Sequence, residues 1–148
     1  MRERLQPIGL RIALIKSDGH CLYRAVAQQL AVTGRQPHAT EEDFRDVRQR
    51  AAHFLRSHAD TYMPFIEADN PEEYNSYCDT VQNTAEWGGQ VELQALSESL
   101  EVPIEVWKAT EAPLSLGSEY PGTPLRVSFH EHYYALGAHY NSVISDNT

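Results

Sequence analysis

The sequence has little of what marks several large classes of protein. Its two cysteines, Cys21 and Cys78, are too few for a disulfide framework, and they form no C-x-x-C pair of the kind that binds zinc or performs redox chemistry. No run of about 18 apolar residues is present to cross a bilayer, and the basic N-terminal stretch lacks the apolar segment of a signal peptide. We therefore expect a soluble intracellular protein with no membrane partner, located in the cytoplasm or the nucleus.

Positive charge is scarce as well. The chain carries 12 Lys and Arg residues against 21 Asp and Glu residues, which gives a formal net charge of -9 at pH 7. Because the phosphates of nucleic acids bind clustered Lys and Arg, this balance argues against a nucleic-acid partner. An acidic surface favours a basic protein or peptide, but acidic surfaces also simply keep proteins soluble. Charge alone does not decide between these two interpretations.

The pattern of apolar residues predicts an α+β fold. With 148 residues, 41% of them hydrophobic, the chain can bury a core, and we interpret residues 1–148 as a single domain. Helical spacing dominates the first two thirds and strand-like alternation the last third, which indicates helices packed around a small, mostly antiparallel sheet. The spacings predict helices over 21–33, 41–56, 71–81 and 90–100, strands over 9–15, 102–107, 125–129, 132–136 and 139–144, and a loop over 109–124.

A capping signature opens the second of these helices. Thr40 with Asp43 three residues later is typical of a helix N-terminus. An apolar face follows at helical spacing, made of Phe44, Val47, Ala51, Phe54 and Leu55. The intervening polar residues are predicted to face water, and we interpret this helix as scaffold; they are Arg45, Arg48, Gln49 and Arg56.

The stretch "SDGHCLYRAVAQQL", residues 17–30, places Cys21 directly after a turn and in the first turn of a helix. A cysteine attacks as the thiolate, and a free thiol titrates at about pH 8.5. The unpaired amides and the dipole of a helix N-terminus favour negative charge at this place. The turn made by Asp18, Gly19, His20 and Cys21 also offers backbone N–H groups to an oxyanion, and Gly19 leaves that backbone unobstructed. Asp18 has a simpler interpretation too, as a cap for the helix.

A histidine is needed to accept the proton of the thiol, and the sequence has seven. The surroundings of His139 suit this role best. Gly137 and Ala138 before it allow close approach, and Asn141 follows two residues later on the same face of a strand. The amide oxygen of Asn141 would fix the tautomer of the imidazole, as in the Cys-His-Asn sites of thiol proteases.

Other interpretations of these residues are structural. A lone cysteine is most often a buried core residue, and Cys78 in the middle of a helix is expected to be inert. His130 and His132 share a strand face, but no further ligands follow at the spacing of a zinc site. We expect these two histidines to be ordinary strand residues and predict no metal site.

Three motifs in order, "DGHCLYRAVAQQL", "EWGGQVELQALSESLEVPIEVW" and "YYALGAHYNSVI", resemble the OTU (ovarian tumour) family of cysteine deubiquitinases. The branch most similar is the eukaryotic OTU-domain subgroup 6, and the resemblance runs from about residue 8 to residue 143. It implies a papain-like OTU fold with the nucleophile at a helix N-terminus. Relatives in this branch often carry a helical region before the catalytic domain, which we expect to be absent from this chain.

The resemblance also implies roles for individual residues. Cys21 would be the nucleophile, His139 the general base and then the general acid, and Asn141 the residue that orients His139. Asp18 matches the aspartate that shapes the oxyanion turn. The implied reaction is hydrolysis of the isopeptide bond at the C-terminus of ubiquitin or polyubiquitin through a thioester, with no metal or cofactor. The chain departs from many relatives at His20, where they carry Asn, and other branches have Asp in place of Asn141.

The proposed substrate agrees with the charge of the chain. The tail of ubiquitin, Arg-Leu-Arg-Gly-Gly, is basic and ends in two glycines, so it suits an acidic approach and a narrow slot. Trp87, Gly88 and Gly89 are candidates to line that slot, with the aromatic ring covering the diglycine. The alternative is that Trp87 belongs to the core and the glycines merely precede a helix.

Two other functions remain open from the sequence. The chain could be a catalytically incompetent OTU module that binds ubiquitin, because a thiol–imidazole contact displaced by about 1 Å can lose roughly 100-fold in rate. It could also be a papain-like thiol protease with another peptide substrate. Binding of ubiquitin without turnover would favour the first, and cleavage of unrelated peptides the second.

Overall fold

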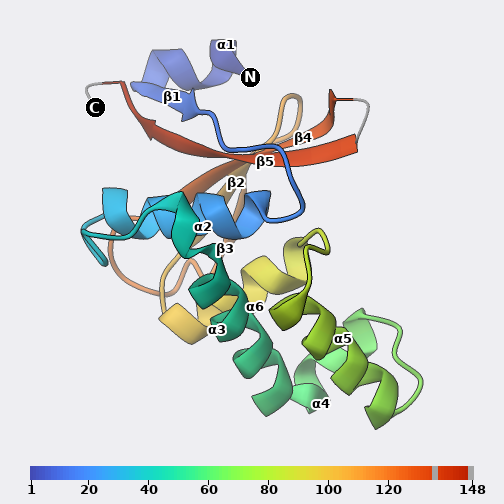
Figure 1. The fold of residues 1–148 in the computed structure, drawn as a ribbon. Helices are drawn as coiled ribbons and strands as arrows, with labels where there is room; N and C mark the ends of the chain where they lie inside the picture. The colour runs from blue at the N-terminus through green and yellow to red at the C-terminus, as the bar shows by residue number, and fades with distance from the viewer. Residues whose placement is uncertain (135–136, 147–148) are drawn as a thin grey trace.

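A five-stranded sheet forms one layer of the molecule, and most of the helices lie on one side of it (Figure 1). The computed structural model describes residues 1–134 and 137–146. The helices are α1 (Arg2–Leu5), α2 (Cys21–Val32), α3 (Phe44–Ser57), α4 (Ala59–Tyr62), α5 (Pro71–Asn83) and α6 (Gln90–Leu100), with 3-10 turns η1 (Gln6–Ile8), η2 (Glu41–Asp43) and η3 (Met63–Phe65). The strands are β1 (Leu10–Ala13), β2 (Ile104–Trp107), β3 (Leu114–Leu116), β4 (Leu125–Tyr134) and β5 (Gly137–Ser145).

The sheet brings the first strand of the chain beside the last. Its order is β1-β5-β4-β2-β3, and every neighbouring pair is antiparallel except β2 with β4. This arrangement confirms the α+β class and the mostly antiparallel sheet. Strand β1 pairs with β5 from Leu10 opposite Ser145 to Ala13 opposite Ser142. The segment that runs from β1 to Cys21 therefore starts next to the strand that carries His139.

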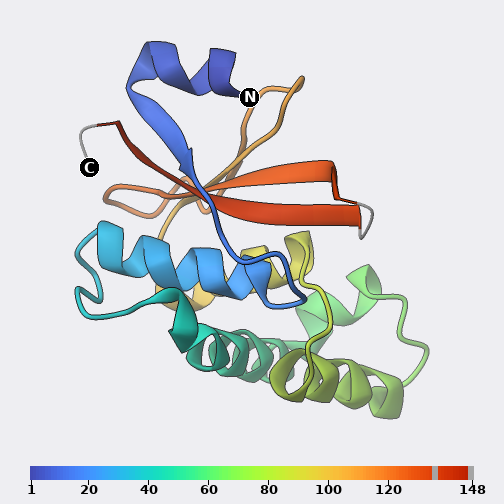
Figure 2. The same ribbon diagram turned by 45° about the horizontal axis from the view of Figure 1, so that its top comes forward.

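Helix α2 is held between the sheet and α3 (Figure 2). It is almost entirely buried, because apolar residues such as Leu22, Ala25 and Val26 leave no polar face to water. The buried side-chain amide of Gln29 joins the helix to two strands: Nε2 donates to Ser142 Oγ at 2.7 Å and to the Val143 carbonyl at 2.8 Å. The oxygen of the same amide accepts the Arg126 N–H at 2.8 Å. These bonds fix the position of the helix along β5.

The local helix signals of the sequence are confirmed. Thr40 and Asp43 form a reciprocal capping box ahead of α3, with the Thr40 N–H donating to Asp43 Oδ2 at 2.8 Å. Asn70 caps α5 by accepting the Glu73 N–H at 2.9 Å, and Pro71 occupies the first helical position. Each of these interactions spans two to four residues, which is why the sequence alone reveals it.

The strands predicted over 125–129 and 132–136 form a single strand, β4, through residue 134, and residues 135–136 lie outside the described residues. Two other expectations from the sequence are wrong. Arg48 does not face water: its side chain is 1% exposed. It lies four residues after Phe44 and three before Ala51, within the apolar face of α3, and carbonyl oxygens satisfy its guanidinium there. The second error is the loop predicted over 109–124, which contains the short strand β3; β3 pairs with β2 in spite of the glycine and prolines around it.

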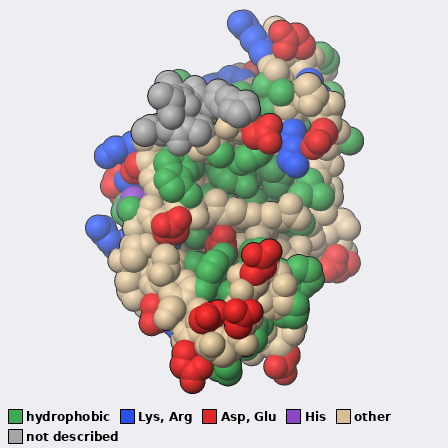
Figure 3. All heavy atoms as spheres, turned by 90° about the vertical axis from the view of Figure 1, so that its right-hand side faces the viewer, with side chains coloured by type: hydrophobic (Ala, Val, Ile, Leu, Met, Phe, Trp, Pro, Cys, Tyr) green, Lys and Arg blue, Asp and Glu red, His purple; other side chains and the backbone are tan. Residues whose placement is uncertain are grey.

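The surface agrees with the charge of the sequence. Figure 3 shows one side of the molecule, where acidic side chains predominate over its lower half and apolar side chains are exposed between them. Within residues 1–134 and 137–146, no helix is long and apolar enough to cross a membrane.

Candidate active site

Cys21 is the first residue of α2, and its sulfur lies against β5. The Tyr140 N–H donates to Cys21 Sγ at 3.5 Å, a contact that joins residues 119 positions apart. Tyr140 directly follows His139, so the sulfur lies against the strand that carries the imidazole. The thiol is buried, with 1% of Cys21 exposed.

His139 and Asn141 form the pair that the sequence predicts. His139 Nε2 lies 2.8 Å from Asn141 Oδ1, and both side chains are buried. The Ile15 N–H also donates to Asn141 Oδ1, at 2.8 Å. Because a backbone N–H can only donate, this atom of Asn141 must be the oxygen, and His139 Nε2 must then carry a hydrogen. A neutral His139 is therefore held in the tautomer that leaves the lone pair on Nδ1.

The environment of Cys21 acts on its pKa in two directions. Burial raises the pKa of the thiol above its ordinary value, while hydrogen bonds from the Tyr140 and Leu22 amides lower it in part. The net direction is upward, so the expected lowering by the helix N-terminus is outweighed by burial. This direction favours the neutral thiol at rest, so Cys21 needs a base to become a nucleophile.

Asp18 holds the turn that precedes the helix. We call residues Asp18–Cys21 the cysteine turn. Arg24, one turn into α2, donates two hydrogen bonds to the carboxylate of Asp18, from Nη2 to Oδ2 at 3.0 Å and from Nε to Oδ1 at 3.2 Å. The His20 N–H donates to Asp18 Oδ1 at 2.9 Å. Burial opposes ionisation of Asp18, but these hydrogen bonds and the charge of Arg24 outweigh it, so the pKa of Asp18 lies below its ordinary value.

Three of the four backbone N–H groups expected to serve an oxyanion are already engaged. The Asp18 N–H donates to the Lys16 carbonyl at 3.1 Å, and the Cys21 N–H donates to the Asp18 carbonyl at 3.2 Å. The His20 N–H is bound by the Asp18 carboxylate. Among the described residues, the Gly19 N–H alone of these four makes no hydrogen bond. This leaves the Gly19 N–H as the candidate oxyanion donor among the four.

The loop before α6 lies against the cysteine turn, and we call residues Ala85–Gly89 the tryptophan loop. Both ribbon views place this loop beside the start of α2 (Figures 1 and 2). Trp87 is 39% exposed, which does not fit the alternative that it is a core residue. At Gly88 a Cβ would lie 2.9 Å from the hydroxyl of Tyr23 and 3.1 Å from Leu22 Cδ1. Backbone without a side chain therefore passes over the residues that follow Cys21.

Gly89 serves as the N-cap of α6, as the second part of that alternative proposed. Its N–H donates to Glu92 Oε1 at 2.8 Å, and the Tyr77 hydroxyl donates to Glu92 Oε2. Glu92 is 3% exposed. Burial raises the pKa of Glu92 above its ordinary value, although the two hydrogen bonds lower it in part. This buried carboxylate fixes the end of the tryptophan loop.

Sequence reasoning missed several of the residues that surround the site. Arg48 contacts both the cysteine turn and the tryptophan loop. Its position within the apolar stripe of α3 is the signal that could have revealed it.

His130 pairs across β4 and β5 with His139, and its Nε2 lies 2.8 Å from Ser128 Oγ. The side chain of His132 lies outside the described residues. Cys78 is buried in α5, and burial raises the pKa of its thiol.

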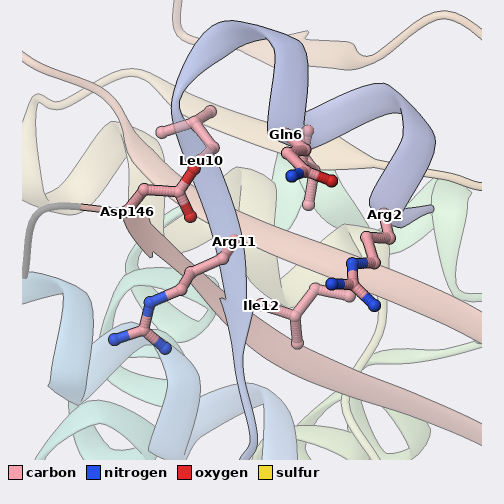
Figure 4. Close-up of a pocket in the computed structure, with 7 residues that line it drawn as sticks. Arg2, Gln6, Leu10, Arg11, Ile12 and Asp146 are labelled. Carbon is pink, nitrogen blue, oxygen red and sulfur yellow. The ribbon is translucent and has the colours of Figure 1, made fainter.

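A separate surface hollow lies beside β1 (Figure 4). It is lined by Arg2, Leu5, Gln6, Leu10, Arg11, Ile12 and Asp146. None of these is a cysteine or histidine, so the hollow contains no candidate nucleophile. In the part of the chain that the structure describes, no cluster of three or more His, Cys, Asp or Glu side chains is arranged to hold a metal ion.

The helix-borne cysteine beside a strand-borne histidine–asparagine pair is the arrangement of a papain-like cysteine protease. Comparison with protein families agrees. The family model described as "OTU-like cysteine protease" matches residues 16–140. The chain therefore belongs to the OTU-like cysteine protease family, as the motifs indicated.

Similar proteins support this assignment. "Deubiquitinase OTUD6B" of Mus musculus is 41% identical over 144 residues, which cover 90% of this chain and 46% of that protein. The chain thus spans about half the length of the curated relatives it matches. Among solved structures, the OTUD1 OTU domain gives a TM-score of 0.73 at 22% identity and covers 97% of this chain and 91% of its own. An OTU domain in complex with ubiquitin gives a TM-score of 0.73 at 20% identity, covering 94% of this chain and 72% of its own.

Proposed function

We propose that the chain is a cysteine-type deubiquitinase, a thiol hydrolase that cleaves the isopeptide bond between the C-terminal glycine of ubiquitin and a lysine. The observation that carries the proposal is the contact of the Cys21 sulfur with the residue after His139, beside the His139–Asn141 hydrogen bond. Membership of the family and the similarity to proteins named deubiquitinases support the choice of substrate. So does the structural similarity to an OTU domain that binds ubiquitin.

The first half of the reaction forms a thioester. His139 Nδ1 removes the proton of Cys21, and the thiolate attacks the carbonyl carbon of the terminal glycine. The carbonyl oxygen becomes an oxyanion that accepts a hydrogen bond from the Gly19 N–H. When the intermediate collapses, the C–N bond breaks and His139 returns its proton to the lysine amine, which leaves.

The second half regenerates the enzyme. His139 removes a proton from water, and the resulting hydroxide attacks the thioester carbonyl. The C–S bond breaks, the sulfur recovers the proton from His139, and the carboxylic acid of ubiquitin loses its proton to solvent as the carboxylate is released. Asn141 serves both halves, because its bond to Nε2 keeps the lone pair on Nδ1 and stabilises the imidazolium. Neither half requires a metal or a cofactor.

The walls of the site suit the tail of ubiquitin. Gly88 brings bare backbone next to Leu22 and Tyr23, which fits a slot for two glycines. Trp87 is exposed enough to cover a bound chain. The net charge of -9 favours the two arginines that precede the diglycine.

One observation favours a second candidate, a catalytically incompetent module that binds ubiquitin without cleaving it. Burial leaves Cys21 1% exposed and raises the pKa of its thiol, so the resting site is not activated. A peptide must also displace whatever covers the sulfur before it can react. We prefer the enzyme because the His139 tautomer is already the one that a general base needs.

A ubiquitin derivative that carries an electrophile at its C-terminus separates these candidates. We expect the 148-residue chain to be labelled covalently, the Cys21→Ala variant to remain unlabelled, and the Cys78→Ala variant to be labelled at the wild-type rate. Labelling that persists in Cys21→Ala would refute the assignment of the nucleophile. Binding of ubiquitin with neither labelling nor turnover would favour the incompetent module, and cleavage of unrelated peptides without ubiquitin binding would favour another thiol protease.

His139→Ala tests the base. We expect it to lower turnover by about 100-fold or more while the chain stays folded at the assay temperature, because its role is proton transfer. Loss of a buried side chain should still lower Tm. A collapse of folding equal to the loss of turnover would indicate a core histidine instead.

A further inference from the structure

Arg48 is a buried cation whose hydrogen-bond partners are all neutral. Its side chain, 1% exposed, donates from Nε to His20 Nδ1 at 2.9 Å, from Nη1 to the Val81 carbonyl at 2.8 Å, and from Nη2 to the carbonyls of Gly19 at 2.9 Å and Glu86 at 2.7 Å. Its guanidinium carbon also lies 4.1 Å from the centre of the Tyr23 ring. Among the described residues no carboxylate forms an ion pair with it.

The contribution of this buried cation to folding stability does not by itself explain its presence. Removing a guanidinium from water costs free energy that neutral acceptors repay only in part, and apolar residues of similar volume often stabilise a core better. The position within the apolar stripe of α3 would accept a residue of that kind. A role in holding particular backbone groups accounts for the arginine.

The backbone groups that Arg48 holds belong to the cysteine turn and the tryptophan loop. Both polar groups of the peptide between Gly19 and His20 are hydrogen-bonded: the Gly19 carbonyl accepts from Arg48 Nη2, and the His20 N–H donates to the Asp18 carboxylate. This peptide therefore cannot rotate without breaking two charge-assisted hydrogen bonds. The preceding peptide, which carries the Gly19 N–H, is held through its own carbonyl, since the Asp18 oxygen accepts the Cys21 N–H at 3.2 Å.

The same nitrogen of Arg48 joins the two segments. Nη2 donates both to Gly19 in the cysteine turn and to Glu86 in the tryptophan loop, which lies 38 residues beyond Arg48 in the sequence. The contact between the segments is close, because a Cβ on Gly19 would lie 1.6 Å from the Ala85 carbonyl oxygen. One planar guanidinium thus holds the cysteine turn and the tryptophan loop at a fixed spacing beside Cys21.

His20 provides the fourth hydrogen-bond acceptor of Arg48. Its ring stacks on Phe44 at 4.0 Å between centroids, and its Nδ1 accepts the Arg48 Nε–H. Burial and the charge of Arg48 lower the pKa of His20, which keeps its ring neutral and able to accept. An asparagine would present its amide oxygen near the place of Nδ1, so His20→Asn is a conservative test of this acceptor.

We propose that Arg48 is a positioning residue that fixes the cysteine turn relative to the tryptophan loop and thereby directs the Gly19 N–H toward the oxyanion. The positional part of this proposal is independent of the substrate, and its catalytic consequence rests on the proposed function. Arg48 itself does not touch the reacting atoms.

Amide hydrogen exchange tests the positional part, without any substrate. We expect Arg48→Met to accelerate exchange by about tenfold in peptides that cover both the cysteine turn and the tryptophan loop, since each loses a hydrogen bond from a charged donor. Arg50→Met, on the exposed side of the same helix, should change neither. Unchanged exchange in either segment of Arg48→Met would overturn the proposal.

Kinetics test the consequence. Hydrolysis of a ubiquitin C-terminal amide forms an oxyanion, whereas alkylation of Cys21 by iodoacetamide does not. In Arg48→Met we expect kcat for hydrolysis to fall by about 100-fold with KM changed by less than about threefold. The plateau rate of alkylation at alkaline pH should stay within about threefold of the wild-type rate. An unchanged kcat, or an alkylation rate that falls by the same factor as kcat, would refute the role.

Two further variants keep the test decisive if Arg48→Met does not fold. Arg48→Lys retains the charge and one donor, and we expect an intermediate loss of about tenfold in kcat because lysine lacks the planar fork. His20→Asn should retain most of the activity and His20→Ala should lose part of it. A lysine variant with wild-type kcat and wild-type exchange would contradict the proposal. A wild-type chain that hydrolyses no ubiquitin substrate would refute the proposed function, while the exchange experiment would still decide the role of Arg48.

Discussion

Replacing Gly19 by alanine would bring a methyl group onto the backbone of the tryptophan loop. The added Cβ would lie 1.6 Å from the Ala85 carbonyl oxygen and 2.8 Å from its carbonyl carbon. The obstacle is backbone rather than the end of a flexible side chain, so no rotamer change can remove it. Relief of the clash requires the cysteine turn and the tryptophan loop to separate by roughly 2 Å, to an ordinary contact distance.

This separation should cost both stability and activity. Overpacking of this kind typically lowers the free energy of unfolding by about 1–3 kcal/mol. A displacement of about 1 Å at a reacting group can cost roughly 100-fold in rate, and the Gly19 N–H is the oxyanion donor in the proposed mechanism. We therefore expect Gly19→Ala to lower kcat by about 100-fold or more.

Gly34→Ala is the matched control. Gly34 has φ +78° and no atom within 4 Å of an added Cβ, so alanine there is strained only by its left-handed backbone, at about 1–2 kcal/mol. The two variants should thus lose similar stability, seen as a fall of about 2–4 °C in Tm per kcal/mol for a chain of this size. Only Gly19→Ala should lose kcat. Wild-type kcat in Gly19→Ala, or an equal loss in both variants, would refute the reasoning.

Three further predictions concern the surrounding residues. Asn141→Ala leaves the buried N–H groups of Ile15 and His139 without their acceptor, so the free energy of unfolding should fall by about 1–3 kcal/mol and kcat should fall. Asn141→Asp keeps an oxygen at this position and should retain activity. Equal kcat in both variants would contradict this role. Burial raises the pKa of Glu92, so its contribution to stability is fully present below its unfolded pKa of about 4.3 and is lost as the pH rises through its folded pKa. The unfolding free energy of wild type relative to Glu92→Gln should therefore decline as the pH rises above the unfolded pKa, and parallel pH profiles from chemical denaturation would disprove it. Trp87→Ala should raise KM for a ubiquitin substrate several-fold with a stability change within about 0.5 kcal/mol, because the side chain is partly exposed; a large fall in Tm would instead make Trp87 a core residue.

Much of the site is encoded in short stretches of sequence. The start of α2 at Cys21, the capping box of Thr40 and Asp43, and the cap at Asn70 each depend on groups within four residues of one another. Interactions of this range follow from residue type and spacing, so they are predictable without coordinates. The motifs around Cys21 and His139 also indicated the family, which the family comparison confirms.

Other features escaped the sequence because they depend on which surfaces meet. Arg48 is a charged residue within the apolar stripe of α3, and only the packing of α3 beside the cysteine turn supplies the four acceptors that surround it. Glu92 looks like an ordinary first-turn acid until Tyr77 and the tryptophan loop bury it. Strand β3 forms because β2 offers it an edge, against the local preference of its glycine- and proline-rich surroundings.

The sequence by itself determined which chemical groups are present and where the helices that carry them begin, since these depend on neighbouring residues. Only the tertiary structure decided that the Cys21 sulfur meets the strand of His139, across 119 residues, and that the Ile15 amide holds Asn141, across 126. The physical reason is that the pairing of β1 with β5 and the packing of α2 on the sheet arise from burial of apolar surface over the whole chain, and no local pattern specifies the partners that this burial brings together.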